Sequence, residues 1–473
     1  MRTRLIVNEL GGASGAPPRP PARFARMNRA PLACLIVAVF VAGWTSRIHA
    51  DDWPQWRGPH GNGVSTEKGL PSRWSKDSVA WKAPLGGLGV SSPVVWGERI
   101  FVTSQVGRGV RRPGNHPTLA RGEEASAEKP LGGARATGDE GAVRGVEFLV
   151  EAFHRKDGRR LWQYRFASEG DLPAIHDKHN LASPSPVTDG RHVYVWFGTG
   201  QLVALDMDGR LAWQRSIAKE YSPFEVDWGH GSSPALYGEL LYLLCDHKPA
   251  SYLLALDKRT GKEKWKADRG KDRKSHSTPT LITGPRGDEL IINSSERIDA
   301  YDPRSGELLW HTGEANRFPI PVPAFEGGVL YASRGYRSGP YMAIRTGGRG
   351  DVTRSHVQWS VATGAPYVSS LVYYDGLVYM ANDAGIVTCV DAKNGDKVWQ
   401  ERIAGIFTAS PVAGDGKVYL LSETGEVLVL AAGREPRVLE RNVMDERMVA
   451  SPAVSGGQIF IRTDANLIGI GSN

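Results

Sequence analysis

The sequence has few cysteines. Its 473 residues include three of them, and Cys34 lies in a leader segment described below. The remaining two, Cys245 and Cys389, fall in different repeats, so a disulfide would require two distant segments to meet within bridging distance. We therefore expect two buried, reduced thiols, which excludes a disulfide scaffold and a cysteine-based metal site.

The body of the chain also lacks an excess charge of one sign. The formal net charge is +7, but residues 1–50 hold seven arginines and a single acid. The rest of the chain has 51 basic and 50 acidic residues. Nucleic-acid binding requires a concentrated basic surface, so the near-neutral body argues against it. Nucleophile-elbow, HExxH and Walker motifs are absent as well.

Residues 1–50 are typical of a secretory leader. An arginine-rich stretch precedes an apolar run, residues 32–44, that is too short for a comfortable membrane span. We expect translation from Met27, cleavage after Ala50, and a periplasmic or extracellular mature protein with no transmembrane span. The alternative is an uncleaved N-terminal anchor.

The mature chain is dominated by a repeat of about 40–50 residues. Each unit opens with a small-Ser-Pro-apolar run, continues through Gly-containing turns between apolar strands, and ends on a strand that carries Trp. Asp-Gly and Asn-Gly steps between such strands indicate hairpins. The strand-opening proline recurs at Pro93, Pro186, Pro234, Pro279, Pro323, Pro411 and Pro452, with Leu371 in the same place in the sixth repeat.

This period predicts an all-β fold, an eight-bladed β-propeller of four-stranded antiparallel blades. The eighth repeat ends after three strands, while Trp81 lies on a strand with no repeat before it, so we expect the N-terminal strand to close the last blade. Residues 78–473 then form the propeller and residues 51–77 an extended arm. Residues 105–147, which are poor in apolar side chains, are predicted to be a surface or disordered insertion in blade 1.

The segments 256–265, 301–310 and 390–399 resemble the tryptophan-docking repeat of quinoprotein alcohol dehydrogenases, which also occurs in the non-enzymatic lipoprotein of the outer-membrane β-barrel assembly machine (BamB). The opening segment, residues 53–59, resembles the start of secreted quinoprotein-like repeat proteins. The resemblance covers nearly all of the mature chain and is structural. It implies that a Trp of each blade stacks on a turn of its neighbour, which assigns docking roles to Trp81, Trp162, Trp213, Trp265, Trp310, Trp359 and Trp399.

The chain departs from the family's dehydrogenases in its chemistry. Those enzymes hold pyrroloquinoline quinone (PQQ) under a vicinal cysteine disulfide and bind Ca²⁺ with Glu, Asn and Asp. This sequence has no adjacent cysteine pair, and the calcium ligands have no evident counterpart. PQQ and Ca²⁺ are therefore possible cofactors only under an alternative hypothesis.

Functional residues of propellers lie in loops at the channel mouth, and two readings of these loops stay open. One is a metal site of mixed His and carboxylate ligands. The alternative is that the same side chains only bond to loop backbone and to neighbouring charges. The candidate metal ligands are His176, His179, Glu225, Asp227 and His230, and Asn180 of the same loops is a further candidate for ligand binding.

The other reading is an anion or sugar site. Arginines can fork onto a carboxylate or phosphate, and aromatic rings can stack on a ligand. The alternative is that these side chains brace long loops. The candidates are Trp228, Arg317, Arg334, Tyr336, Arg337 and Tyr367.

These observations favour an exported, non-catalytic propeller that binds a protein or another ligand through its loop face. The first alternative is a PQQ- and Ca²⁺-dependent oxidoreductase of alcohols or sugars. The second is a polysaccharide-active propeller enzyme, which ranks lower because no paired carboxylates stand out.

Overall fold

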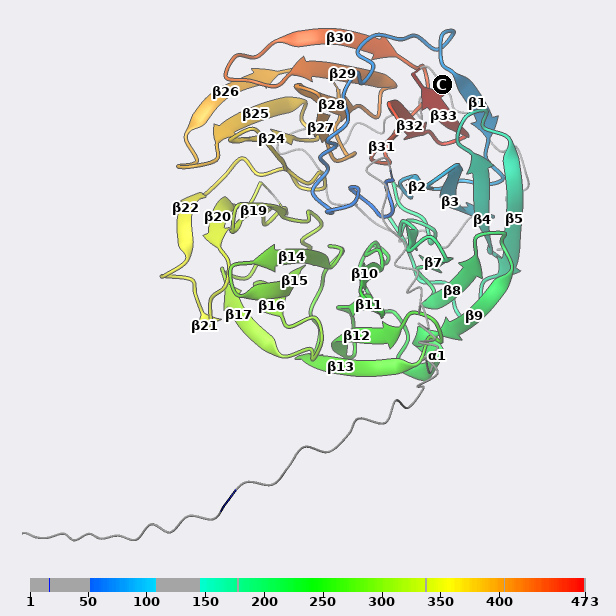
Figure 1. Ribbon diagram of the computed structural model, residues 1–473, viewed down its shortest axis with the longest axis vertical. Coiled ribbons are helices and arrows are strands. Elements are labelled where there is room, and N and C mark those ends of the chain that lie inside the picture. Colours follow the sequence, from blue (N-terminus) through cyan, green and yellow to red (C-terminus); the bar gives the residue numbers. More distant parts are fainter. Residues whose placement is uncertain are drawn as a thin grey trace, which may run out of the picture. The chain divides into compact units, whose positions relative to one another are not determined.

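The computed structural model describes Pro17 and residues 52–107, 145–176, 178–336, 338–403 and 405–471. Apart from Pro17, the predicted leader with its start and cleavage site lies outside these ranges. From β1 onward, eight sheets surround a central channel, as Figure 1 shows. Within the same ranges the helical content is one turn, α1 (Ile217–Glu220), and no helix is long and apolar enough to cross a membrane.

Each sheet is one blade, whose first strand lies innermost and whose last strand lies at the rim (Figure 1). Blade 1 contains β2 (Val94–Trp96), β3 (Arg99–Val106), β4 (Glu147–His154) and β5 (Arg160–Ala167). Blade 2 contains β6 (Val187–Thr188), β7 (His192–Trp196), β8 (Gln201–Asp206) and β9 (Leu211–Ser216). Blade 3 contains β10 (Ala235–Tyr237), β11 (Leu240–Cys245), β12 (Ser251–Asp257) and β13 (Glu263–Gly270). Blade 4 contains β14 (Thr280–Gly284), β15 (Gly287–Asn293), β16 (Ile298–Tyr301), β17 (Leu308–Thr312) and β21 (Gly350–Asp351).

The remaining blades follow in chain order around the ring. Blade 5 contains β18 (Ala324–Glu326), β19 (Val329–Ser333), β20 (Tyr341–Arg345) and β22 (Val357–Val361). Blade 6 contains β23 (Val372–Tyr374), β24 (Leu377–Ala381), β25 (Ile386–Asp391) and β26 (Lys397–Arg402). Blade 7 contains β27 (Val412–Gly414), β28 (Lys417–Leu421), β29 (Glu426–Ala431) and β30 (Val438–Val443). Blade 8 contains β31 (Ala453–Ser455), β32 (Gln458–Arg462), β33 (Asn466–Ile470) and β1 (Trp81–Pro84).

The predicted all-β, eight-bladed propeller is confirmed. β1 pairs antiparallel with β33 in the register Trp81–Gly469, so the N-terminal strand closes the last blade and removes a free sheet edge. One blade departs from the four-stranded pattern: β21 adds to the rim of blade 4, parallel to β17. Cys245 and Cys389 are free and buried in blades 3 and 6, as expected.

The small-Ser-Pro motif joins neighbouring blades around the channel. The hydroxyl before the strand-opening residue accepts a hydrogen bond from the equivalent backbone N–H of the preceding blade. The donor–acceptor distances are 2.9–3.1 Å for the pairs Ser92–Ser185, Ser185–Ser233, Ser233–Thr278, Val322–Ser370, Ser370–Ser410 and Ser410–Ser451. This series of hydrogen bonds is interrupted at Val322, which has no hydroxyl to accept a bond from blade 4. We call these residues the hydroxyl ring.

At the rim, most of the repeated tryptophans contact the turn of the next blade. Their indole N–H groups donate to backbone oxygens at 2.8–3.1 Å, in the pairs Trp81–Arg155, Trp162–Met207, Trp213–Lys258, Trp359–Ala392 and Trp399–Gly433. Trp265 packs against Gly306 of blade 4. Trp310 differs from the others: it is fully buried and donates to Glu289 of its own blade at 2.9 Å, beside the added strand β21. The docking role implied for Trp310 therefore does not match its hydrogen bond.

The arm, residues 52–77, runs from the middle of the ring, where it is drawn in blue, out to the rim (Figure 1). Trp53 forms an antiparallel bridge with Val95 in blade 1, and Gly63 accepts a hydrogen bond from Ala413 in blade 7 at 2.9 Å. The buried Arg57 donates to the Leu371 carbonyl of blade 6 at 2.6 Å. The arm thus links opposite sides of the propeller across its channel.

The strands that flank the predicted insertion are longer than the sequence indicated. β3 and β4 pair from Arg99–His154 to Val106–Glu147, so the first and last residues assigned to the insertion belong to strands. The hydrophobic alternation there is broken by Gln105, whose side-chain amide caps Gly107 and whose oxygen accepts from Leu181. Residues 108–144 lie outside the described part of the chain.

Candidate binding site

A cavity of about 210 Å³ lies in the channel at the loop face, and every repeat contributes the residue at one equivalent position to its wall. That residue stands three positions before the strand-opening proline, or before Leu371 in blade 6. The eight are Val90, Ser183, Gly231, His276, Ile320, Val368, Thr408 and Val449. Blades 8, 1, 5 and 6 thus present aliphatic side chains, whereas blades 2, 3, 4 and 7 present small or polar residues. We call this space the mouth cavity.

The arm closes the inner end of the mouth cavity. Trp56 lines the cavity, and its indole N–H donates to Ser451 of the hydroxyl ring at 3.3 Å. The rest of the arm bonds first to residues near the innermost strands, such as Leu371, and then to Asn442 on the rim strand β30. A ligand therefore enters this part of the channel from the loop face.

Loops between the blades complete the wall of the mouth cavity. His176, His179, Trp228 and Tyr367 all line it, so four of the predicted residues converge there. Lys178 reaches from the blade 2 loop to Glu423 of blade 7, with Nζ 3.0 Å from Oε1, which ties together opposite sides of the mouth. Among the described lining residues none is an aspartate or glutamate.

A second cavity, of about 570 Å³, adjoins the first and shares Trp228 with it. It lies among the loops that precede blades 3, 4 and 5, and we call it the side cavity. Asp227, Arg317 and Tyr336, all predicted site residues, line it together with Lys274, Ser295, Glu296, Ala315, Asn316 and Phe318. The expected convergence of the loops on one side of one face is therefore present, divided between two cavities.

Four predicted residues serve other purposes. His230 is buried between Trp196 and Phe224, at ring-centroid distances of 4.3 and 5.3 Å, beneath the cavity walls. Burial and the neighbouring histidines lower its pKa well below the ordinary value. Asn180 is buried, and its side chain accepts from the Ala182 N–H at 3.0 Å to shape its own loop.

Glu225 and Arg334 also fall outside both cavities. Glu225 is exposed and forms a backbone bridge with Lys248. Arg334 is 1% exposed and donates to the carbonyls of Ser294 and Glu314 at 2.8 and 3.0 Å, so it braces blade 5 against blade 4 instead of facing a ligand. Arg337 lies outside the described residues.

Comparison with known proteins agrees with this architecture. A family model described as outer membrane protein assembly factor BamB matches residues 146–401 and 383–471, well over half of the chain. The chain belongs to this family of PQQ-like β-propellers. Its matched region begins at the third strand of blade 1 and runs to the last strand of the ring.

Individual members of the PQQ-like propeller family are distant in sequence. The outer membrane protein assembly factor BamB of Yersinia pestis is 20% identical over 325 residues, which are 66% of each chain. The quinoprotein alcohol dehydrogenase PedH of Pseudomonas putida is 26% identical over 240 residues, 48% of this chain and 35% of that enzyme. The chain thus matches about a third of the dehydrogenase's length.

Solved structures share the fold. BamB from Moraxella catarrhalis superposes with a TM-score of 0.50 at 17% identity, covering 70% of this chain and 92% of that one. Quinohemoprotein alcohol dehydrogenase from Comamonas testosteroni superposes with a TM-score of 0.57 at 11% identity, covering 89% and 81%. At these identities the likeness concerns architecture alone.

The channel residues do not fit a calcium-bound quinone. Ca²⁺ takes about six to eight oxygen ligands, with carboxylates prominent among them, and the described wall of the mouth cavity contains no carboxylate. Across the ranges that the structure describes, no three His, Cys, Asp or Glu side chains form a group that could hold a metal ion. The predicted His and carboxylate ligands are thus dispersed, and the two cysteines lie in separate blades.

Several residues that line the two cavities were not predicted from the sequence. Trp56 belongs to the non-repeating arm, so its place in the channel depends on topology. Phe318 adjoins the predicted Arg317 but was not itself predicted, and Glu296 lies in the turn between β15 and β16. The sequence signal for His276 is its position three residues before the strand-opening Pro279, an equivalent position that every repeat has.

Proposed function

We propose that this protein is an exported, non-catalytic propeller that binds a protein partner by taking one of its side chains into the mouth cavity. The observation that carries the proposal is a cavity at the channel mouth, whose wall combines aromatic and aliphatic side chains with histidines and uncharged hydroxyl groups. Anchors of this kind, buried in a pocket at the centre of an interface, supply much of the affinity of protein complexes.

Electrostatics supports an uncharged anchor. Burial lowers the pKa of His276 to about 4, so its imidazole is neutral at neutral pH. Lys178 is paired with Glu423. The mouth cavity therefore offers stacking surfaces and neutral hydrogen-bonding groups, which suit an aromatic or aliphatic side chain better than an ion.

Two further points support a binding role. The relative from Yersinia pestis, which matches 66% of this chain, carries the name of an assembly factor, and the channel residues do not fit the dehydrogenase cofactors. Export rests on the leader pattern in residues 1–50, and N-terminal sequencing of the mature protein would test cleavage after Ala50.

Site-specific photocrosslinking in cells that make the protein tests the proposal. Tyr367, in the mouth, and Tyr164, on the rim strand β5, are each replaced by the photoreactive aromatic residue benzoylphenylalanine. We expect a discrete protein adduct, identified by mass spectrometry, from position 367 only. Equal adduct yields at both positions, or none at position 367, would contradict a partner at the mouth.

A quinoprotein oxidoreductase is the second candidate, favoured by the match to the dehydrogenase of Pseudomonas putida. Adding PQQ and Ca²⁺ to the purified protein distinguishes the two functions. We expect no bound-quinone absorbance after desalting and no dye-linked oxidation of alcohols or sugars. Stoichiometric quinone with turnover would establish the oxidoreductase.

A further inference from the structure

The side cavity has the features of a prebuilt ligand site distinct from the mouth cavity. Its wall is built by three consecutive inter-blade loops, which contribute Asp227 and Trp228, then Lys274, then residues 315–318. Its volume of about 570 Å³ falls within the range of about 300–1,000 Å³ usual for small-ligand sites.

Two aromatic residues on this wall hold unusual backbone conformations. Trp228 has φ +75° and Phe318 has φ +49°, both in the left-handed region that bulky residues rarely adopt. Packing maintains them: Trp228 lies 5.7 Å from His176, and Phe318 lies 5.5 Å from Tyr336, between ring centroids. Strain of this kind gathers at ligand clamps, where it sets the direction of particular side chains.

The charged groups of the side cavity are mostly paired, and one is not. Lys274 Nζ lies 2.9 Å from Asp227 Oδ2, and Arg273 Nη2 lies 2.8 Å from Glu296 Oε2. Arg317 is exposed at the cavity and makes no hydrogen bond or ion pair with any residue that the structure describes. The unmatched charge of the cavity is therefore positive, and it sits on a fork of donors suited to a carboxylate.

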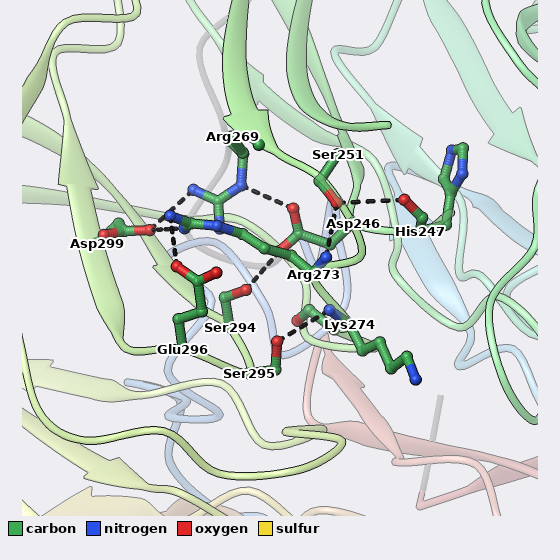
Figure 2. Close-up of polar contacts among 12 residues, drawn as sticks. Asp246, His247, Ser251, Arg269, Arg273, Lys274, Ser294, Ser295, Glu296 and Asp299 are labelled. Atoms are coloured by element: carbon green, nitrogen blue, oxygen red, sulfur yellow. Dashed lines mark hydrogen bonds and ion pairs between the residues drawn. The ribbon is translucent and has the colours of Figure 1, made fainter. Parts of the chain in front are cut away.

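A buried ion network fixes the base of this cavity (Figure 2). Arg269 Nε and Asp246 Oδ1 are 2.7 Å apart, and Arg269 and Arg273 both contact Asp299, at 3.0 and 2.6 Å. Arg273 extends from this network to Glu296 at the cavity wall, whereas the Lys274 side chain points away from it (Figure 2). Because the network holds the buried Arg273 in place beside the cavity, this part of the wall needs little ordering when a ligand binds.

We propose that the side cavity binds an acidic sugar, a hexuronate unit, with the sugar ring against the aromatic side chains and its carboxylate on Arg317. Ala315 is the sole aliphatic residue among the described lining residues, so the cavity suits a flat, hydroxyl-rich ring better than an apolar peptide side chain. Asn316, Ser295 and the paired charges provide the donors and acceptors that ring hydroxyls require. The site goes beyond the proposed function and is independent of it.

Calorimetric titration of the purified protein with tri-galacturonate and tri-glucuronate, in about 0.1 M salt, tests this inference. The methyl-esterified trimers, which keep the rings and lose the charge, are the ligand controls. We expect at least one acidic trimer to bind. Its methyl ester should bind at least about tenfold more weakly, because a charge-assisted bond to Arg317 is lost.

Arg317→Ala should weaken the acidic trimer about tenfold or more, and Arg317→Lys should do so less. Arg437→Ala, which removes an equally exposed arginine from blade 7, should leave affinity unchanged. Both positions are exposed, so the variants should fold. The photocrosslink from position 367 should persist in Arg317→Ala, which separates this site from the proposed function.

Three outcomes would overturn the inference. One is the absence of binding by either acidic trimer. Another is equal binding of inorganic phosphate or penta-glutamate, which would make the cavity an anion or acidic-peptide site. The third is an equal effect of the two alanine variants.

Discussion

Replacing Arg269 with Met should destabilise the propeller severely, because among the described residues Arg269 is the one cation paired with the buried Asp246 carboxylate. Arg269 and Asp246 are both fully buried in a bidentate pair, with distances of 2.7 and 3.0 Å. Once Arg269 is removed, the Ser294 hydroxyl still donates to Asp246 Oδ2 at 2.6 Å but carries no charge. Met fills much of the vacated volume, so the effect reports mainly on charge.

The second carboxylate of the network, Asp299, keeps other cations when Arg269 is removed. Asp299 contacts Arg273 at 2.6 Å and Arg297 at 2.7 Å as well as Arg269. Burial opposes its ionisation, yet these arginines hold its pKa below the ordinary value. The cost of Arg269→Met therefore arises at Asp246, and breaking such a buried pair costs about 3–5 kcal/mol. Arg297→Met removes a partly exposed partner of Asp299 and should cost about 1 kcal/mol or less.

Equilibrium unfolding in urea, followed by tryptophan fluorescence, measures these free energies. The double variant Arg269→Met/Asp246→Leu removes both charges and should recover about 2 kcal/mol or more relative to Arg269→Met, since buried pairs are often replaced by apolar residues at little cost. A loss below about 1 kcal/mol for Arg269→Met, or a double variant as unstable as the sum of its single variants, would refute this reasoning.

Two further perturbations test the rim and the loops. Gly209→Ala places a Cβ 2.6 Å from the Trp162 ring at φ +83° and should lower the free energy of unfolding in urea by about 2–3 kcal/mol. The control Gly376→Ala has a similar φ of +78° but open space around the new Cβ, so it should cost less. Equal costs would show that the contact with Trp162 has no role. Burial raises the pKa of Asp383 from 3.8 to about 6. The folded carboxyl thus binds its proton more tightly than the unfolded one, so stability relative to Asp383→Asn should fall by about 2 kcal/mol as pH rises from 4 to 6. A pH-independent difference between the two proteins would contradict this.

The architecture was predictable because the same strand and turn pattern recurs in every repeat. The strand-opening prolines and the closing tryptophans fixed the blade count, and the isolated strand at Trp81 predicted the closure with β33. The hydroxyls before the prolines join the blades, which gives that part of the motif a physical reason. Propensity and period are local properties, so they determine strands and turns well.

The candidate site was only partly predictable, because it depends on which loops face one another. Trp228 and Tyr336 line cavities as expected. Arg334 instead donates its hydrogen bonds to carbonyls of the neighbouring blade, and His230 packs in an aromatic core. Nothing local distinguishes an arginine that braces loops from one, such as Arg317, that faces solvent. Trp56 reaches the channel only because the arm crosses it.

The most direct test of the binding role is to fill the mouth cavity and measure the protein photocrosslink from position 367. Val449→Trp places a large side chain in the cavity wall, and Val443→Trp makes the same change at a position on β30 that is 48% exposed. We predict that the partner adduct is lost in Val449→Trp and retained in Val443→Trp. An adduct that persists when the cavity is filled would contradict the claim that a partner enters the mouth of this propeller.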